Sequence, residues 1–583
     1  MITERTIRNG AVELAVYEQG DPAAETLLLL HGWPDTHHLW DNVAPRFAER
    51  FHVIAVDNRG HGKSTNPTGE LSIPTLASDY AAVIDAVSPD RPVHILAHDW
   101  GSISAWEVVC RPGAEARIAS FTSVSGPSLP HGARWMRSRL ARPTPRNIAL
   151  PLAQLGSFGY SLFFSLPFLP QATIRAALSE DRWRAGLSAI EGAPPEQIRL
   201  APTFMDDIVN GLGIYRATWA GNPLQAQDRP TKVPVQIIVG SRDPAIRQST
   251  YTDEAKWVDE VYLRVVKGGG HWLPFSHPEL LISATLEMID AVSGKEPARA
   301  LRRSRMGVQR KPFEDQLVVI TGGGSGIGRE TALAFAADGA EVVLSDVRFE
   351  AAEETAGLIK SAGGVAHPYA LDVADAAAVN AHAAEVMAAH GVPDVLINNA
   401  GIGQAGTFRE TPAEDFDRVL NVNLHGVING CRAFAGAMTD RGAGGHIVNL
   451  SSMAAFAPQQ GFSAYATSKS AVFMFSDCLR AELDSADIGV STICPGIVHT
   501  NIVATTKFSG VSAEDEARKQ QRFDRLYERR GYGPEKVAAQ IVKAVKDNKQ
   551  IVPVTPEAQL QYRFNRIAPG INRFAAAKAR LIR

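Results

Sequence analysis

The sequence has 583 residues, of which 45% are hydrophobic and 21% are charged, and its formal net charge is −3. This length exceeds what one hydrophobic core supports and predicts two or more domains, while the near-neutral charge argues against a general nucleic-acid binder. The N-terminal residues contain no apolar signal segment, so we expect a cytoplasmic protein. Scattered cysteines favour a reducing compartment and neither a disulfide framework nor a zinc site; they are Cys110, Cys431, Cys478 and Cys494.

Short apolar segments alternate with helical stretches through the first half of the chain. Segments of this length and composition are typical of buried parallel strands joined by crossover helices, so we expect an α/β fold. In such sheets the chemistry gathers at the carboxyl ends of the strands, where this chain places polar residues. The expected strands are Thr26–Leu30, His52–Val56, Pro92–Ala97, Ile118–Val124, Val235–Val239 and Val261–Val266.

The segment PVHILAHDWGS, residues 92–102, predicts a strand that runs into a sharp turn at Asp99 and then into a helix. The small residue Gly101 permits the close approach of strand and helix that such a turn needs. A structural role for Asp99 as a helix N-cap is the alternative. Asp243 and His271 follow later strands, and the order nucleophile, acid, base favours a catalytic interpretation of all three.

A carboxylate nucleophile restricts the reaction. Attack by Asp99 on an sp³ carbon gives an ester, which water activated by a His–Asp pair can hydrolyse. A serine at the same position would leave an ether that these groups cannot cleave. The sequence therefore favours the opening of an epoxide or a haloalkane over ordinary ester hydrolysis. Asp57, in DNRGHGKS, also follows a strand, and we interpret it as part of a framework turn.

The motifs HGWP, DNRGHGKS, HDWGS, GSRD and GGGHW together resemble the soluble epoxide hydrolases of the α/β-hydrolase fold, over residues 1–295. The resemblance implies two lid tyrosines that donate hydrogen bonds to the epoxide oxygen, and Tyr160 and Tyr215 match them. It also implies an oxyanion hole formed by the backbone N–H groups of Trp33 and Trp100. Haloalkane dehalogenases share the aspartate turn but commonly carry Asn after HG, and they stand as the alternative.

The lid expected at residues 128–228 contains an arginine-rich stretch, residues 131–146, followed by the uncharged stretch Asn147–Ile174. A transmembrane helix is one interpretation, because the uncharged stretch is long enough, but its three prolines and two glycines argue against it. The other interpretations are a lid that covers an apolar site and a lid that docks on a lipid surface through its arginines. Both favour an apolar substrate, and the second adds peripheral contact at the inner membrane surface.

A basic segment, PARALRRSRMGVQRKPF, joins the two halves at residues 297–313. It carries six basic residues, no acidic residue and little apolar periodicity. We expect a flexible linker that spans on the order of 20 Å between a hydrolase domain at residues 1–296 and a second domain at residues 314–583. A linker this short predicts a high effective concentration of one domain near the other.

The second half begins with the strand Leu317–Ile320 and the glycine-rich sequence TGGGSGIG at residues 321–328. These glycines let the backbone approach a pyrophosphate at a helix N-terminus, which predicts a dinucleotide-binding fold. The next strand, Glu341–Ser345, is followed by Asp346, at the distance expected of a residue that contacts the adenosine ribose. A carboxylate there favours NAD, and two nearby arginines leave NADP as the alternative.

TGGGSGIG, LDV, NNAG, YxxxK and PG follow one another in an order that resembles the classical short-chain dehydrogenases/reductases, over residues 314–555. The resemblance implies a Rossmann fold, a bound NAD or NADP and a homo-oligomer. Its cofactor-binding positions correspond to Thr321, Gly322, Ser325, Gly326, Ile327, Gly328, Asp346, Asp372, Val373, Asn399, Ala400, Gly401, Tyr465, Lys469, Pro495, Gly496 and Thr500.

Tyr465 and Lys469 are four residues apart and therefore share one face of a helix. The lysine charge can favour the phenolate, which makes Tyr465 a candidate general acid/base for hydride transfer to or from a carbinol. The resemblance adds Ser452 as the residue that orients the substrate oxygen, in preference to Ser451. It also adds Asn423 as the residue that holds Lys469 through water.

The whole chain resembles the actinobacterial fusions of an epoxide hydrolase with a short-chain dehydrogenase, of the mycobacterial epoxide hydrolase D type. The resemblance implies a bifunctional enzyme that converts epoxides, here expected to be lipids, to vicinal diols and interconverts alcohols and ketones. No metal-ligand cluster is visible in the sequence. Residues 501–530 are expected to form the substrate loop, and residues 562–583 an interaction segment. The alternatives are a dehalogenase-like first half, or one idle half that serves in binding or membrane targeting.

Overall fold

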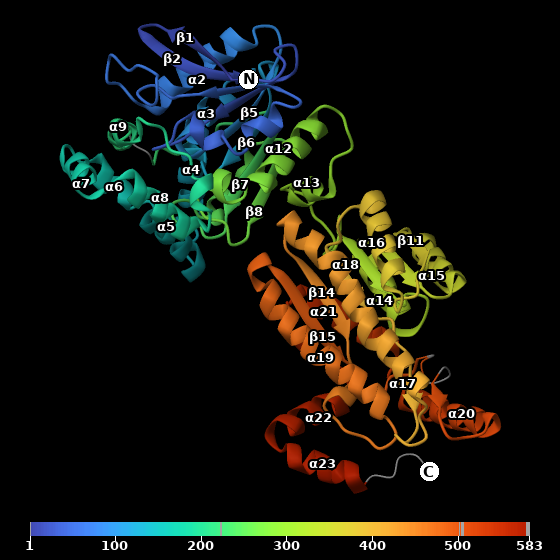
Figure 1. Ribbon diagram of the computed structural model, residues 1–583. Helices are drawn as coiled ribbons and strands as arrows, with labels where there is room; N and C mark the ends of the chain where they lie inside the picture. The colour runs from blue at the N-terminus through green and yellow to red at the C-terminus, as the bar shows by residue number, and fades with distance from the viewer. Residues whose placement is uncertain (1, 222–223, 501, 503–505, 579–583) are drawn as a thin grey trace. The chain divides into compact units, whose positions relative to one another are not determined.

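The computed structural model describes residues 2–221, 224–500, 502 and 506–578 (Figure 1). The chain divides into two compact units, Met1–Val308 and Gln309–Arg583. Each unit is built around a largely parallel sheet with helices packed against it, so the predicted α/β fold class is confirmed. Within the described residues, no helix is both long and apolar enough to cross a membrane.

The first unit contains an eight-stranded sheet in the order β1-β2-β4-β3-β5-β6-β7-β8. The antiparallel hairpin of β1 (Thr3–Asn9) and β2 (Val12–Gln19) forms one edge, and the sequence did not predict it. The remaining strands run parallel to one another and are almost entirely buried, as expected from their continuous apolar composition. They are β3 (Thr26–Leu30), β4 (His52–Val56), β5 (Val93–His98), β6 (Ile118–Val124), β7 (Val235–Gly240) and β8 (Val261–Val266).

The helices of the first unit form two groups. One group packs on the sheet: α1 (Ala44–Phe47), α2 (Ile73–Val87), α3 (Asp99–Val109), α11 (Leu273–Ser276), α12 (Pro278–Val292) and α13 (Arg299–Ser304). The other group lies between β6 and β7 and makes up the lid: α4 (Leu129–Leu140), α5 (Pro145–Ser157), α6 (Tyr160–Ser165), α7 (Leu169–Ala177), α8 (Glu180–Glu191), α9 (Phe204–Asn210) and α10 (Gly213–Ala220).

Part of the basic segment between the halves is folded, in contrast to the flexible linker that we expected. Its residues 299–304 form α13, and the fully buried Leu301 packs against Tyr262 and Met288 of the first unit. Farther along, Phe313 is 3% exposed in the core of the second unit. The expectation of a flexible tether is therefore wrong for α13 and for Phe313, because a buried apolar side chain holds each of them in place. The prediction failed because the surrounding arginines dominate the composition of the segment.

The second unit contains a seven-stranded parallel sheet in the order β11-β10-β9-β12-β14-β15-β17, and a two-stranded sheet of β13 and β16. Its strands are β9 (Leu317–Thr321), β10 (Glu341–Asp346), β11 (Val365–Ala370), β12 (Val395–Asn398), β13 (Gln404–Ala405), β14 (Gly445–Leu450), β15 (Ile488–Cys494), β16 (Lys507–Phe508) and β17 (Ile551–Pro553). The order reverses between β9 and β12, and such a switch point places a crevice at the carboxyl ends of the strands.

Helices cover both faces of this sheet. Alternate residues of β9 show the two layers: Val318 and Ile320 pack in one apolar cluster, and Leu317 and Val319 in another. The helices are α14 (Gly326–Ala337), α15 (Phe349–Ser361), α16 (Ala376–His390), α17 (Ala413–Leu420), α18 (Gly426–Arg441), α19 (Ser463–Leu483), α20 (Ala513–Arg530), α21 (Pro534–Lys546), α22 (Pro556–Ile567) and α23 (Pro569–Lys578).

The two segments expected to be a substrate loop and an interaction tail both contain helices. The first holds β16 and α20, and residues 501 and 503–505 of it lie outside the described residues. The second holds the second half of α22 and all of α23, with exposed Phe564, Ile567 and Phe574, while its residues 579–583 lie outside the described residues.

Candidate active sites

Asp99 lies at the turn between β5 and α3, at the carboxyl edge of the first sheet. Its backbone φ is +49°, in the left-handed region that non-glycine residues rarely adopt. Glycines make room for the turn: a Cβ on Gly32 would lie 2.5 Å from the Asp99 side chain, and one on Gly126 would lie 2.4 Å from the Asp99 carbonyl oxygen. This strained, closely packed turn holds the carboxylate in one position.

The structure brings Asp99, Asp243 and His271 together from three separate loops. His271 Nδ1 is 2.9 Å from Asp243 Oδ2, and its Nε2 is 3.6 Å from Asp99 Oδ1. The other oxygen of Asp243 accepts hydrogen bonds from the backbone N–H groups of Ala245 (2.8 Å) and Ile246 (2.9 Å). These bonds fix the Asp243 carboxylate, which in turn orients the imidazole so that Nε2 faces Asp99.

Two carboxylates dominate the electrostatics of His271. Burial favours the neutral ring, but the charges of Asp243 and Asp99 together raise the pKa of His271 well above its usual value. Both carboxylates therefore favour the protonated form of the ring. Loss of the Asp99 charge would lower this pKa and free the ring to act as a base.

Tyr160 and Tyr215, on the lid helices α6 and α10, face each other near Asp99. Their ring centroids are 6.2 Å apart, and their hydroxyls are hydrogen-bonded. Burial is the main cause that raises the pKa of each phenol, and the Asp99 charge raises both further. Both side chains therefore stay protonated and can donate to a group bound beside Asp99.

Trp33 and Trp100 form part of the aromatic wall around Asp99. The backbone N–H of Trp33 donates to Asp99 Oδ2 at 3.0 Å, as an oxyanion-hole group near this carboxyl would. Trp100 is the second residue of α3, directly after Asp99. The indole N–H of Trp33 donates to the Ile208 carbonyl at 2.9 Å, and the Trp100 side chain hydrogen-bonds Tyr215. The two indoles are thus engaged by the protein itself.

In the second unit, the glycine-rich loop between β9 and α14 forms the expected cradle. Gly322 and Gly326 have positive φ angles of +66° and +53°, which favour glycine. A Cβ on Gly324 would lie 2.8 Å from Asp346 Oδ2, which accepts a hydrogen bond from the Gly324 N–H at 3.0 Å. The N-terminus of α14 and the bare backbone of this loop fit a dinucleotide pyrophosphate.

The two arginines near Asp346 differ in how they are engaged. The Arg329 side chain donates to the Gly324 carbonyl (2.8 Å) and to Thr355 Oγ1 (3.1 Å), and it pairs with Glu354. Arg329 therefore supports the loop from the protein side. Arg348 is exposed, and its backbone N–H donates to Asp346 Oδ1 at 3.1 Å.

Helix α19 presents Tyr465 and Lys469 on one face, with Lys469 Nζ 5.9 Å from the centre of the Tyr465 ring. Lys469 is buried, its Nζ donates to the Leu450 carbonyl at 2.8 Å, and burial lowers its pKa to about 8. Ser451 Oγ donates to the Lys469 carbonyl at 2.8 Å, so this serine supports α19. Ser452 stands at the start of the next turn, and its Oγ accepts from the Ala454 N–H.

Asn423 lies in a single π-helical turn, Asn421–His425, and is fully buried. Its side-chain oxygen accepts from the Ile402 N–H at 2.8 Å, and its nitrogen donates to the Ile402 carbonyl at 3.0 Å. A Cβ placed on Gly401 would lie 3.2 Å from Asn423 Oδ1 and 3.4 Å from Lys469 Nζ. The side chains of Asn423 and Lys469 therefore both lie close to Gly401.

The other expected cofactor residues follow the same strand ends. The Asn399 side chain donates to the carbonyls of Thr321 (3.1 Å) and Gly322 (2.9 Å) and ties β12 to the glycine-rich loop. Thr500 Cβ lies 3.3 Å from where a Cβ of Gly326 would be. The remaining positions, directly after β11, β12 and β15 or within the glycine-rich segment, are Asp372, Val373, Ala400, Gly401, Pro495, Gly496, Ser325, Ile327 and Gly328.

Comparison with known proteins matches both units. The alpha/beta hydrolase fold family matches residues 25–278, and the short chain dehydrogenase family matches residues 316–508. The protein named "Probable oxidoreductase EphD" from Mycobacterium tuberculosis is 48% identical to this chain over 98% of this chain and 97% of its own length. The chain belongs to the EphD family. The predicted resemblance is thereby confirmed.

Members of the EphD family join a hydrolase-fold domain to a short-chain dehydrogenase domain, and the second domain implies binding of NAD(H) or NADP(H). The second half is also 35% identical to "C alpha-dehydrogenase" from Sphingobium, over 43% of this chain and 83% of that protein. A crystal structure of a short chain dehydrogenase/reductase from Burkholderia phymatum in complex with NAD is 30% identical, covers 45% of this chain and 96% of its own, and gives a TM-score of 0.40.

Two buried acids of this EphD-family hydrolase unit escaped the sequence analysis. Asp35 accepts a hydrogen bond from Trp272 Nε1 at 3.0 Å, and burial raises its pKa to about 7. Glu191, at the end of α8, accepts from the His271 N–H at 2.9 Å, and burial raises its pKa as well. Asp35 directly follows HGWP, which was a usable signal, whereas no motif marks Glu191 within the lid.

Proposed function

We propose that the first domain hydrolyses epoxides to vicinal diols through an ester on Asp99, and that the second interconverts alcohols and ketones with a nicotinamide cofactor. One observation carries the first part of this proposal. A carboxylate at a strained turn lies 3.6 Å from His271 Nε2, and its charge raises the pKa of two nearby lid phenols. This arrangement supplies a nucleophile, a base and proton donors around one reacting carbon.

The proposed epoxide reaction has two steps. Asp99 attacks an epoxide carbon, the C–O bond breaks, and the leaving oxygen takes a proton from Tyr160 or Tyr215. The resulting ester carries no charge at Asp99, so the pKa of His271 falls and the ring gives up its proton, which restores the phenol of the tyrosine. The neutral Nε2 can then remove a proton from water. The hydroxide attacks the ester carbonyl, backbone N–H donors stabilise the oxyanion, and the diol leaves as the Asp99 carboxylate is restored.

The alternative of haloalkane opening has weaker geometric support. A departing halide needs N–H donors that point at it, but the Trp33 indole N–H donates to Ile208 and the Trp100 side chain bonds Tyr215. An epoxide oxygen needs a proton, which the two phenols can supply. The donors around Asp99 therefore favour an epoxide.

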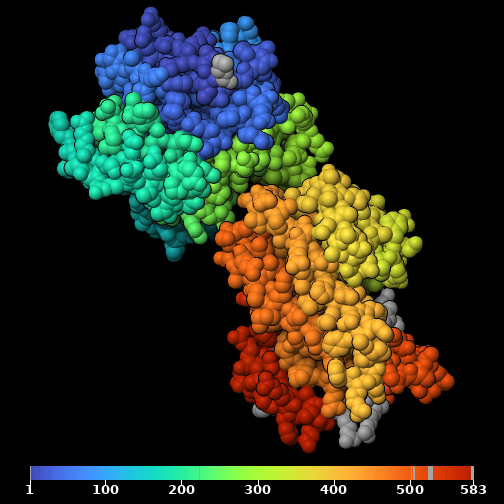
Figure 2. Space-filling model, in the orientation of Figure 1, coloured from blue at the N-terminus to red at the C-terminus, as the bar shows by residue number. Residues whose placement is uncertain are grey.

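The lid surface supports a lipid-like substrate and contact with a lipid surface. Figure 2 shows the lid helices (teal) at the surface of the first unit. Exposed apolar side chains gather on α5, α6 and α7, with Phe168 84% exposed, and exposed arginines flank them at Arg142 and Arg146. Apolar side chains rimmed by cations suit an anionic lipid layer. We name this set the lid apolar surface: Leu152, Leu155, Leu162, Phe163, Leu166, Phe168 and Leu169.

Replacing Phe168 with serine is expected to weaken binding to anionic vesicles by about tenfold or more, because one exposed aromatic side chain loses its burial in lipid. Vesicle flotation of the full chain measures the bound fraction. Leu358→Ser, which alters a 45% exposed apolar residue on α15, should leave binding unchanged. A wild-type protein that stays wholly in the soluble fraction would remove lipid docking from the proposal.

For the second domain, we propose NAD as the cofactor and Tyr465 as the acid/base. Asp346 ends β10, where its carboxylate can accept hydrogen bonds from ribose hydroxyls, and Arg329 is already engaged by the loop. The cofactor, when bound, accepts or donates the hydride at the substrate carbon. The Tyr465 hydroxyl exchanges the proton of the substrate oxygen, Ser452 orients that oxygen, and the Lys469 charge stabilises the phenolate.

Asp346→Ala is expected to raise the ratio of kcat/KM for NADP over that for NAD by roughly 10- to 100-fold. The substitution removes the carboxylate that repels the 2′-phosphate of NADP. Steady-state kinetics with both cofactors measures this ratio. Glu350→Gln, which removes an exposed carboxylate in the first turn of α15, serves as the matched control. An unchanged ratio in Asp346→Ala would assign cofactor choice to other residues.

Mass spectrometry of a long-chain epoxide incubated with the full chain tests the paired function. The proposal predicts a product that gains one water without cofactor, and a second product that loses two hydrogens only when NAD is present. The diol is our candidate substrate for the second site. Halide release from a chloroalkane without turnover of any epoxide would instead establish the dehalogenase alternative.

A further inference from the structure

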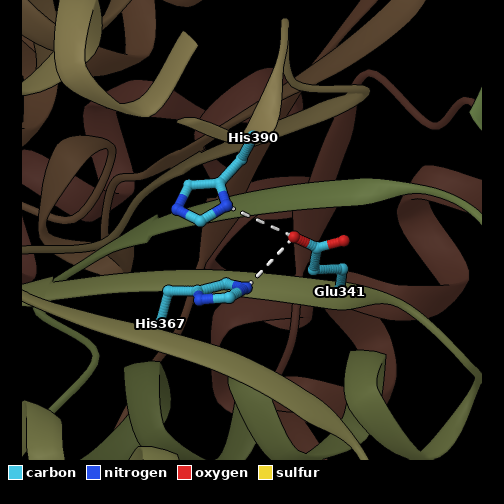
Figure 3. Close-up of side chains that lie close together, drawn as sticks. All are labelled: Glu341, His367 and His390. Carbon is cyan, nitrogen blue, oxygen red and sulfur yellow. Dashed lines mark hydrogen bonds and ion pairs between the residues drawn. The ribbon is translucent and has the colours of Figure 1, made fainter. Parts of the chain in front are cut away.

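Three potential metal ligands meet at one edge of the sheet in the dehydrogenase unit (Figure 3). Glu341 is the first residue of β10, His367 lies in the neighbouring β11, and His390 is the last residue of α16. One ligand atom from each residue lies within 4.8 Å of the others. Their separations of 23 and 26 residues along the chain give no recognisable motif, so the sequence analysis did not find the cluster.

The distances within the cluster fit a bound ion. His367 Nε2 lies 3.1 Å and His390 Nδ1 lies 3.5 Å from the same oxygen, Glu341 Oε1. In a tetrahedral site with bonds of about 2.1 Å, neighbouring ligand atoms stand roughly 3.4 Å apart. These two spacings differ from this value by only a few tenths of an ångström, and the two histidine nitrogens lie within 4.8 Å of each other, so side-chain movements would complete the site.

A fourth residue can set the orientation of one ligand. The Tyr369 hydroxyl is 3.0 Å from His390 Nε2, the ring nitrogen that faces away from Glu341. With the proton on Nε2, the lone pair of Nδ1 points at the cluster, which is how outer hydrogen bonds prepare metal-binding histidines. The side chains of His367, Glu341 and His390 are 33%, 21% and 13% exposed, so an ion can reach them from solvent.

We propose that Glu341, His367 and His390 bind Zn²⁺ and cross-link β10, β11 and the end of α16. Two imidazoles and one carboxylate suit zinc and its neighbours in the first transition row, and not Ca²⁺ or Mg²⁺, which prefer all-oxygen sites. Glu341 and Asp346 stand at opposite ends of β10, about 17 Å apart along the strand. The ion therefore stabilises the nucleotide-binding half of the sheet and takes no part in hydride transfer.

The competing explanation is a set of ordinary His–Glu ion pairs, which would give similar distances without a metal. Titration of the metal-free full chain with Zn²⁺ separates the two. We expect one Zn²⁺ per chain. Losing a residue that only hydrogen-bonds a metal ligand typically weakens metal affinity by roughly 10- to 100-fold, and Glu341→Gln and His367→Ala should each weaken the affinity for Zn²⁺ by more than this. Tyr369→Phe should fall within that range.

His38→Ala serves as the matched control, because His38 forms a comparable pair with Asp41 (2.9 Å) in the hydrolase unit. It should bind Zn²⁺ as the wild type does. Loading with Co²⁺ adds a geometric readout: the visible absorption of a tetrahedral site should appear in the wild type and the control, and vanish in His367→Ala. If His367→Ala does not fold, Glu341→Gln and Tyr369→Phe carry the test. A wild type that binds no Zn²⁺, or a Glu341→Gln variant that binds it equally well, would overturn the proposal.

Discussion

Asp99→Ala should lower epoxide turnover by roughly 10⁴-fold or more, the largest effect expected from any single substitution in the first domain. Under our proposal this carboxylate forms the bond to the substrate carbon, from a position fixed by the Trp33 N–H and close to His271. Alanine removes the nucleophile and keeps the turn small. The rate of diol formation by the purified full chain, measured by mass spectrometry, gives the result.

His271→Gln sharpens this prediction, because it removes the base of the second step and spares the nucleophile. The peptide that contains Asp99 should then gain the mass of the epoxide and keep it. Alcohol oxidation by the second domain serves as the internal control in both variants, since the two active sites belong to separate units. Asp99→Ala with undiminished epoxide turnover would refute the assigned nucleophile.

Tyr465→Phe is the second large effect, with an expected fall of roughly 10²- to 10⁴-fold in kcat for alcohol oxidation. The substitution removes only the hydroxyl to which we assign the proton exchange, and it keeps the ring near Lys469. NAD binding, followed by fluorescence, should remain, because the glycine-rich loop and Asp346 are untouched. Hydride transfer monitored by NADH absorbance measures the loss.

Ser361→Ala is the control for this experiment, because it removes an exposed hydroxyl from the last residue of α15, where it bonds the Gly357 carbonyl. Its alcohol oxidation should match that of the wild type. A Tyr465→Phe variant with unchanged kcat would mean that another group supplies the proton, and the second domain would then need a different acid/base.

Motifs that are local in sequence predicted the fold and most of the candidate residues. The strand His52–Val56 and the turn at Asp99 were readable because a buried parallel strand is continuously apolar and a tight turn needs small neighbours. The hairpin of β1 and β2 was missed, since four of the first five residues of β1 are exposed and polar. An edge strand held by backbone pairing leaves little apolar signal.

Features that depend on long-range contact were beyond the sequence. Glu191 reaches the His271 backbone from a lid helix eighty residues earlier, and Leu301 anchors a helix inside a run of arginines. Glutamate and leucine also occupy many exposed positions of this chain, so the residue type alone does not reveal these two contacts. For the uncharged lid stretch, the sequence left a covering lid and a docking lid as alternatives, and the 84% exposure of Phe168 supports our proposal of docking.

The central claim is that Asp99 itself supplies an oxygen atom to the product. A single turnover of an epoxide by excess full-chain protein in H₂¹⁸O tests it most directly. The ester route predicts that the first diol carries no label, because its second oxygen comes from the Asp99 carboxylate, and that the label appears in the Asp99 peptide. A labelled diol from the first turnover, with no label at Asp99, would show direct attack by water and contradict the proposed mechanism.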